Sequence, residues 1–141
     1  MDIRQITPRF FAAPQISPED MPAILQAGVT RILCNRPDIE VPPSHQVAQM
    51  KQAAEDAGLE FVVCPLSHQN MTPDVISQNH TLMQDCDGVV LAYCASGTRS
   101  TIAWALASCT EMPVEEVLAA ARRGGYELSN LLPALEEAAR R

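Results

Sequence analysis

Short apolar runs recur along the chain, and the segments between them carry apolar residues at helical spacing. Runs of strand length occupy residues 2–7, 10–13, 30–34, 61–64 and 89–93. The last run, Val-Val-Leu-Ala-Tyr, is apolar throughout, which is typical of a strand buried on both faces of a sheet. The pattern therefore predicts short strands separated by helices and turns.

Helix-start and helix-stop residues divide the rest of the chain into helices. Residues 17–20, Ser-Pro-Glu-Asp, offer a capping hydroxyl, a first-turn proline and two acids, although Pro22 also allows a later start. Gly28 ends this first helix. Pro133 either resets the start of the last helix or kinks it. The other predicted helices cover residues 42–57, 72–85, 100–109, 114–124 and 128–139.

Strands that alternate with helices indicate an α/β fold, with a mainly parallel central sheet and helices on both of its faces. At 141 residues the chain is long enough for one domain, residues 1–141, and it contains no repeat or linker. Ligands of such sheets bind at the carboxyl ends of the strands. Cys94 follows the strand at residues 89–93, so this edge is where we expect the site.

The stretch from Cys94 to Ser100 reads Cys-Ala-Ser-Gly-Thr-Arg-Ser between a predicted strand and a predicted helix. A loop in this position turns its N–H groups inward, and the helix directs its positive end at the same point. Cys94 should ionise easily there, and Arg99 should bind an oxyanion. This pattern favours a covalent cysteine enzyme. The alternative is a buried strand-end thiol beside a helix-capping serine.

Two further strands also end in cysteine, at Cys34 and Cys64, each about thirty residues from the next cysteine of the series. Neighbouring strands lie about 4.8 Å apart, so either thiol is a candidate to resolve or accept sulfur from Cys94. The alternative is that both are small core residues. Cys86 and Cys109 are interpreted as structural.

Composition narrows the partners and the compartment. The formal charge of −7 argues against nucleic acid and acidic membranes, and 4% aromatic residues leave little for base stacking. The start of the chain has no secretory pattern, and five cysteines without C-x-x-C spacing fit a reducing cytoplasm. We expect no metal or other cofactor, because the three histidines are not at ligand spacing.

The loop resembles the phosphate loop of protein tyrosine and dual-specificity phosphatases, which has five residues between cysteine and arginine. Here there are four, as in rhodanese-type sulfurtransferases: Ala95, Ser96, Gly97 and Thr98. Nearly the whole chain is similar to the phosphatase-like domain of beta-lactamase-hydrolase-like proteins. Residues 15–20, 35–38 and 92–100 carry that similarity.

The resemblance implies a phosphatase-like fold with a loop of rhodanese length. Some family members are fused to a metallo-beta-lactamase-like persulfide dioxygenase, which implies sulfur chemistry and a separate dioxygenase as a partner. The primary hypothesis is therefore transfer of sulfane sulfur through a Cys94 persulfide, from a small anionic or persulfide donor to a thiol. A phosphatase acting through phosphocysteine is the alternative, and a non-catalytic anion-binding module is the third.

A phosphatase needs a proton donor for its leaving group. Residues 66–71 contain no acid, Asp74 lies in the first turn of a predicted helix, and His68 could donate a proton near neutral pH. Arg36 and Asp38 follow a strand end on the same edge and either shape the site or make a turn. Ser100 either caps the helix or stabilises the Cys94 thiolate.

Overall fold

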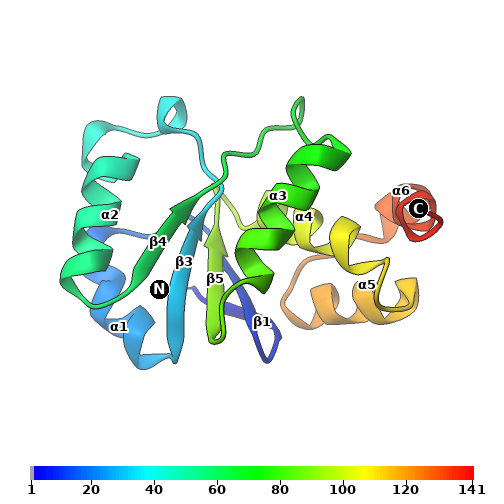
Figure 1. Cartoon of the computed structure of the whole chain (residues 1–141), viewed down its shortest axis with the longest axis horizontal. Helices are drawn as coiled ribbons and strands as arrows, with labels where there is room; N and C mark the ends of the chain where they lie inside the picture. Colours follow the sequence, from blue (N-terminus) through cyan, green and yellow to red (C-terminus); the bar gives the residue numbers. More distant parts are fainter. Residues whose placement is uncertain (1) are drawn as a thin grey trace.

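A five-stranded sheet with the order β1-β2-β5-β3-β4 forms the centre of the computed structural model, which describes residues 2–141 (Figure 1). Strand β1 is antiparallel to β2, whereas β2, β5, β3 and β4 are parallel. The predicted α/β class and the mainly parallel sheet are confirmed. The strands are β1 (Arg4–Thr7), β2 (Phe10–Ala13), β3 (Val29–Cys34), β4 (Glu60–Val63) and β5 (Val89–Tyr93).

Helices cover both faces of the sheet, as the alternating pattern predicts (Figure 1). One face is covered by α1 (Met21–Gln26) and α2 (Val47–Asp56). The other face is covered by α3 (Pro73–Gln84), α4 (Thr98–Ser108), α5 (Val114–Arg123) and α6 (Leu132–Ala139). No helix in residues 2–141 combines the length and the apolar character needed to cross a membrane.

Strand β5 shows why the central strands are apolar throughout. Leu91 and Tyr93 pack with the cluster under α1 and α2, whereas Val90 and Ala92 pack with the cluster under the other four helices. Successive side chains of a strand point to opposite faces, so a strand covered on both sides needs apolar residues at every position. Because β5 is packed on both faces, the loop that follows it starts from a well-anchored position.

Four helix starts differ from the predicted ranges, two of them in the way that Pro22 and Pro133 allow. The segment Pro43–His45 forms a separate 3-10 turn, and α2 begins only at Val47, because Gln46 is extended. A 3-10 turn likewise precedes α1, whereas Pro133 lies in the first turn of α6 and resets its start. Helix α4 begins at Thr98, two residues before the predicted start at position 100.

We predict that Leu33→Ala lowers the free energy of unfolding by about 2–5 kcal/mol, because Leu33 is fully buried in the centre of the sheet. The matched control is Leu25→Ala on α1, where the side chain is 44% exposed and the loss should stay below about 1 kcal/mol. Urea denaturation of both variants measures the difference. Equal losses would contradict this assignment of the core.

Candidate active site

The Cys94 loop connects the carboxyl end of β5 to the start of α4. Cys94 is 1% exposed, and its sulfur accepts a hydrogen bond from the N–H of Gly97 at 3.2 Å. Gly97 has a φ of 92°, and a Cβ there would lie 2.0 Å from the hydroxyl of Tyr126. Glycine is therefore required at this position, both for its backbone conformation and for the close approach of Tyr126.

The remaining loop N–H groups divide into occupied and open donors. The N–H of Thr98 donates to Ser96 Oγ at 3.3 Å, and the Ser96 hydroxyl donates to Thr98 Oγ1 at 2.9 Å. Within residues 2–141, the N–H groups of Ala95, Ser96 and Arg99 have no hydrogen-bond partner. These open donors, together with the start of α4, can bind an anion next to the Cys94 thiol.

Arg99 is held by two acceptors from other loops. Its Nη1 and Nη2 donate to the two carboxylate oxygens of Glu40 at 2.9 and 2.8 Å, and Nη1 also donates to the Leu66 carbonyl at 2.7 Å. The Nε–H has no partner among the described residues, so one edge of the guanidinium stays open. The Glu40 hydrogen bonds raise the pKa of Arg99 against the effect of burial, and the neighbouring Cys94 raises it further.

Glu40 is a site residue that the sequence analysis missed. It lies in the 3-10 turn Asp38–Glu40 after β3, and Arg36 donates to its carboxylate at 3.2 Å. Hydrogen bonds from Arg99, and then from Arg36, lower the pKa of Glu40 despite partial burial. At neutral pH this carboxylate is charged and cannot supply a proton. The i, i+4 spacing of Arg36 and Glu40 is the signal that could have revealed it.

Arg36 and Asp38 have different positions relative to the site. Arg36 supports the site indirectly, because it connects Glu40 to the side-chain oxygen of Gln15 at 3.1 Å. The Gln15 N–H in turn donates to the Ala95 carbonyl of the loop at 3.2 Å. Asp38 instead accepts the N–H of Val47 at 2.8 Å, so its carboxylate serves the start of α2.

A buried polar network fixes the first turn of α4. The Ser100 hydroxyl donates to Asn35 Oδ1 at 2.8 Å, and Asn35 Nδ2 donates to the Cys64 carbonyl and to Asn79 Oδ1. Asn35 is fully buried and was also missed from the sequence. The Ser100 hydroxyl therefore donates to Asn35 and not to the Cys94 sulfur in this structure. A role of Ser100 in stabilising the thiolate remains a prediction.

The loop borders a pocket of about 480 Å³ at the carboxyl edge of the sheet. His68 lies in its wall, whereas Asp74 does not. Asp74 sits in the first turn of α3, where Thr72 caps the helix by accepting the N–H of Val75. The lining residues are Glu40, Ser67, His68, Gln69, Ala95, Ser96, Thr98 and Arg99.

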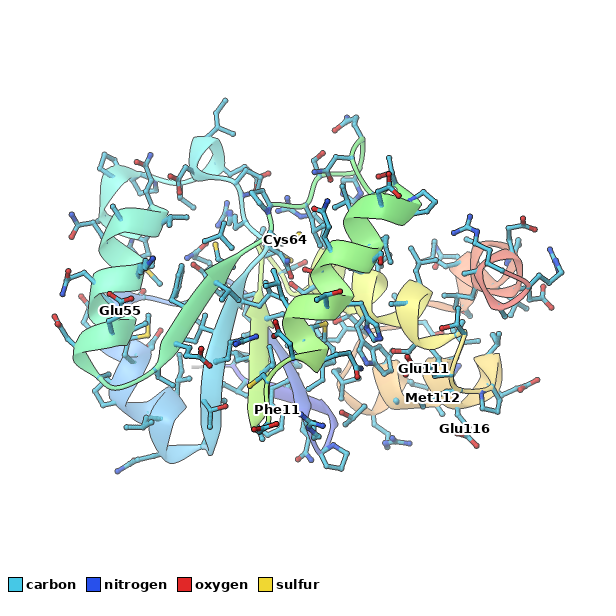
Figure 2. The ribbon with its side chains drawn as sticks, in the orientation of Figure 1. Phe11, Glu55, Cys64, Glu111, Met112 and Glu116 are labelled. Carbon is cyan, nitrogen blue, oxygen red and sulfur yellow. The ribbon has the colours of Figure 1, made fainter. Side chains whose placement is uncertain are left out.

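Cys34 and Cys64 lie at the same sheet edge but outside this lining. Cys34 packs beneath α1 and α2 and donates its S–H to the Arg36 carbonyl at 3.4 Å. Cys64 packs on the opposite face, at the end of β4 (Figure 2). Burial raises the pKa of both thiols, so both are protonated at neutral pH. Their role as resolving or sulfur-accepting thiols remains a prediction.

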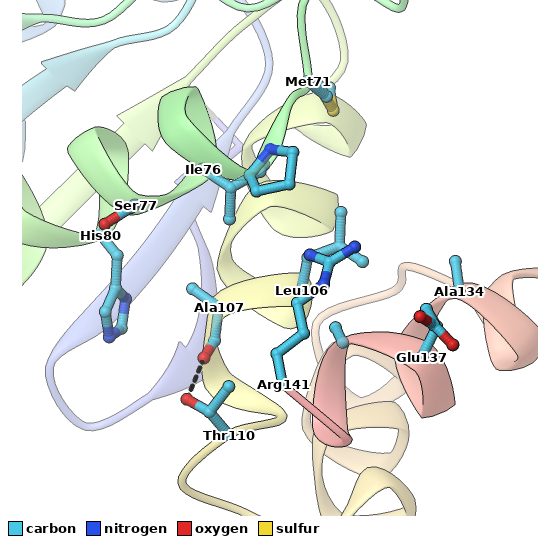
Figure 3. A pocket seen from close by; sticks show the side chains of 12 residues that line it. Met71, Ile76, Ser77, His80, Leu106, Ala107, Thr110, Ala134, Glu137 and Arg141 are labelled. Atoms are coloured by element: carbon cyan, nitrogen blue, oxygen red, sulfur yellow. Dashed lines mark hydrogen bonds between the residues drawn. The ribbon is translucent and has the colours of Figure 1, made fainter.

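A second cavity of about 430 Å³ lies between α3, α4 and α6 (Figure 3). Ile76, Leu106 and Ala138 give it a mainly apolar lining, and it shares no residue with the pocket at the Cys94 loop. Within residues 2–141, no group of three or more histidine, cysteine or acidic side chains is arranged to bind a metal ion.

We predict that Glu40→Gln removes a pH-dependent part of the stability. Because the folded-state pKa of Glu40 is lowered, the ion pair stabilises the fold above the unfolded value of 4.5, and this contribution is lost as the pH falls through the lowered value. The variant should lose about 1–2 kcal/mol of unfolding free energy at pH 7, and this loss should shrink as the pH falls from 4.5 through the lowered value. Urea denaturation as a function of pH measures this difference.

The matched control is Glu55→Gln on α2, because Glu55 is exposed and forms no ion pair within residues 2–141. A gap between the wild type and Glu40→Gln that stays constant or widens at low pH would contradict the assigned ion pair.

Comparison with known proteins places these features in a family. The pattern of the family "Beta-lactamase hydrolase-like protein, phosphatase-like domain" matches residues 2–111. A beta-lactamase hydrolase-like protein of Agrobacterium fabrum is 31% identical over 102 residues, which cover 72% of this chain and 24% of that protein. The chain spans about a quarter to a third of the length of the curated relatives that it matches.

Two solved structures show the same fold. A protein of Neisseria meningitidis Z2491, described as a candidate phosphatase, superposes with a TM-score of 0.86 at 31% identity and covers 98% of this chain and 99% of its own. Tk-PTP in its active form superposes with a TM-score of 0.69 at 16% identity and covers 99% of this chain and 97% of its own. The chain therefore belongs to the family of phosphatase-like domains of beta-lactamase hydrolase-like proteins.

Proposed function

We propose that this domain is a cysteine-dependent phosphatase that hydrolyses phosphate monoesters through a phosphocysteine at Cys94. The observation that carries the proposal is the open side of the Arg99 guanidinium next to the Cys94 loop and its unpartnered N–H groups. A guanidinium edge and a ring of N–H donors together match the oxygens of a phosphoryl group. Membership of a phosphatase-like family supports the same reading over sulfur transfer.

The first step transfers the phosphoryl group to sulfur. The Cys94 thiolate attacks phosphorus, the new S–P bond forms, and the bond from phosphorus to the ester oxygen breaks. The negative charge on the transferred oxygens is stabilised by Arg99 and by the N–H groups of the loop. The departing alkoxide takes up one proton and leaves as the alcohol.

His68 is the residue best placed to supply that proton. Glu40 lies in the same lining, but its lowered pKa keeps it ionised. The His68 side chain has no hydrogen-bond partner among residues 2–141, and an imidazolium can donate a proton near neutral pH. In the second step, water attacks phosphorus and gives one proton back to the His68 imidazole, the S–P bond breaks, and inorganic phosphate leaves with the thiolate restored.

We predict that Cys94→Ser abolishes phosphate release from p-nitrophenyl phosphate, because a serine hydroxyl is a far weaker nucleophile at neutral pH. The loss in kcat should be at least about a thousandfold. The control is Cys109→Ser at the far end of α4, which should retain near wild-type turnover. Retained turnover in Cys94→Ser would rule out the covalent mechanism.

We predict that the effect of His68→Ala depends on the leaving group. An alkyl phosphate needs a proton on its alkoxide, so its kcat should fall by about 10²–10⁴-fold. The nitrophenolate of p-nitrophenyl phosphate leaves readily without a proton, so its kcat should change little. His45→Ala, whose ring bonds to Ser17 outside the pocket, is the control. Equal losses on both substrates would contradict the role of His68 as proton donor.

Transfer of sulfane sulfur is the second candidate, and the four-residue loop favours it because fewer N–H groups surround the anion. In this reaction the Cys94 thiolate attacks the outer sulfur of thiosulfate, the S–S bond breaks, and sulfite leaves with the electron pair. A thiol acceptor then takes the sulfur from the persulfide and restores Cys94. A separate persulfide dioxygenase would consume the product.

Intact-protein mass after incubation of the reduced enzyme with thiosulfate, and phosphate release from p-nitrophenyl phosphate in a parallel tube, separate the two candidates. The phosphatase account expects phosphate release without a stable persulfide. A gain of one sulfur atom that is lost on adding cyanide and absent in Cys94→Ser would support sulfur transfer instead.

A further inference from the structure

One wall of the pocket at the Cys94 loop is a short turn that is held in a single shape. Asn70 accepts the N–H of Ser67 at 2.7 Å through its side-chain oxygen and donates to the Pro65 carbonyl at 3.0 Å. The N–H of Gln69 donates to Ser67 Oγ at 3.3 Å. These bonds hold the backbone of the turn in place. The turn therefore presents the side chains of residues 67–69 to the pocket from a defined backbone.

The side chains of this wall offer hydrogen-bonding groups that the protein does not use. The His68 imidazole and the Gln69 amide have no partner within residues 2–141, and both residues are exposed. The Ser67 hydroxyl accepts one bond and donates none, and Thr98 Oγ1 accepts from Ser96 without donating in turn. Together these groups supply both donors and acceptors next to the position of a bound phosphoryl group.

The lining also lacks a surface for an aromatic ring. No tyrosine, phenylalanine, tryptophan or large aliphatic side chain belongs to it, and Ala95 supplies its one aliphatic side chain. A phenolic leaving group is bound by burial against apolar or aromatic walls. A leaving group that carries hydroxyls would instead satisfy the unused donors and acceptors of Ser67, Gln69 and Thr98.

Charge restricts the number of phosphates. The Glu40 carboxylate belongs to the same lining, and the formal charge of the chain is −7. A second phosphate beside the first would meet this carboxylate, because the paired edge of Arg99 is already occupied. The pocket volume of about 480 Å³ is that of a small-molecule site.

We propose that the substrate is a small aliphatic phosphate monoester that carries additional hydroxyl groups, a sugar or polyol monophosphate. This inference rests on the proposed phosphatase function and assigns the leaving-group side of the pocket to Ser67, Gln69 and Thr98. Each hydroxyl of the leaving group pairs with one of these side chains, and the pairing is lost with an alkyl phosphate of the same length.

The test compares glycerol 3-phosphate with propyl phosphate, because the two differ only in hydroxyl groups. The wild-type enzyme should show a kcat/KM for glycerol 3-phosphate about tenfold above that for propyl phosphate, and above that for phosphotyrosine. Gln69→Leu should reduce the ratio of glycerol 3-phosphate to propyl phosphate by roughly 3–10-fold. The control is Gln26→Leu, because Gln26 is exposed at the end of α1 and lies outside the pocket. This variant should leave the ratio unchanged.

A ratio of one or below, a preference for phosphotyrosine, or an unchanged ratio in Gln69→Leu would overturn the proposed substrate class. p-Nitrophenyl phosphate distinguishes this failure from that of the phosphatase itself. If the wild type hydrolyses p-nitrophenyl phosphate with Cys94 dependence, only the substrate class is wrong. If no phosphate ester is hydrolysed, both proposals fall together.

Discussion

The ion pair between Arg99 and Glu40 is the interaction on which the site depends. A guanidinium has five N–H donors in one plane, and the Glu40 carboxylate and the Leu66 carbonyl occupy three of them. That attachment joins the loop after β3, the segment after β4 and the start of α4 at one side chain. The Nε side of Arg99 is left fixed in orientation and open, which is what a preorganised oxyanion site requires. Arg99 is only 9% exposed. Without Glu40 its buried positive charge would keep the Leu66 carbonyl as its one acceptor among the described residues and would have no opposite charge beside it.

The parallel sheet explains why three cysteines lie at one edge, and the loop explains why Cys94 alone of the three accepts a loop N–H. Cys34 donates its own S–H to a backbone carbonyl, and burial raises the pKa of both Cys34 and Cys64. Cys94 instead accepts the N–H of Gly97, at the start of α4. That difference follows from the positive φ of Gly97, which turns the loop over the sulfur, and from Tyr126, which donates to the Ser96 carbonyl and closes over the glycine.

Much of this arrangement could be predicted from the sequence, because local patterns determine it. Apolar runs located the strands, and the order of strand, loop and helix located Cys94 and Arg99.

Glu40 and Asn35 were missed because their roles depend on contacts with residues 59 and 65 positions away. Asp38 has local features similar to those of Glu40, yet its carboxylate accepts the N–H of Val47 at the start of α2. The start of α2 was predicted too early. Nothing in the local sequence shows that Gln46 is extended and separates the 3-10 turn at Pro43–His45 from the helix. The loop length, the lack of an acid in residues 66–71 and the dioxygenase fused to some family members favoured sulfur transfer over phosphate hydrolysis. Family membership and the Arg99 geometry instead support the phosphatase.

The most direct test of the account is to trap the intermediate. The wild-type enzyme would be mixed with p-nitrophenyl phosphate and quenched in acid within the first turnovers, and the mass of the intact protein and of its peptides would be measured. The account predicts a gain of one phosphoryl group on the peptide that contains Cys94, and none in Cys94→Ser. Phosphate release with no phosphoryl group on Cys94, or with the group on another residue, would contradict the mechanism.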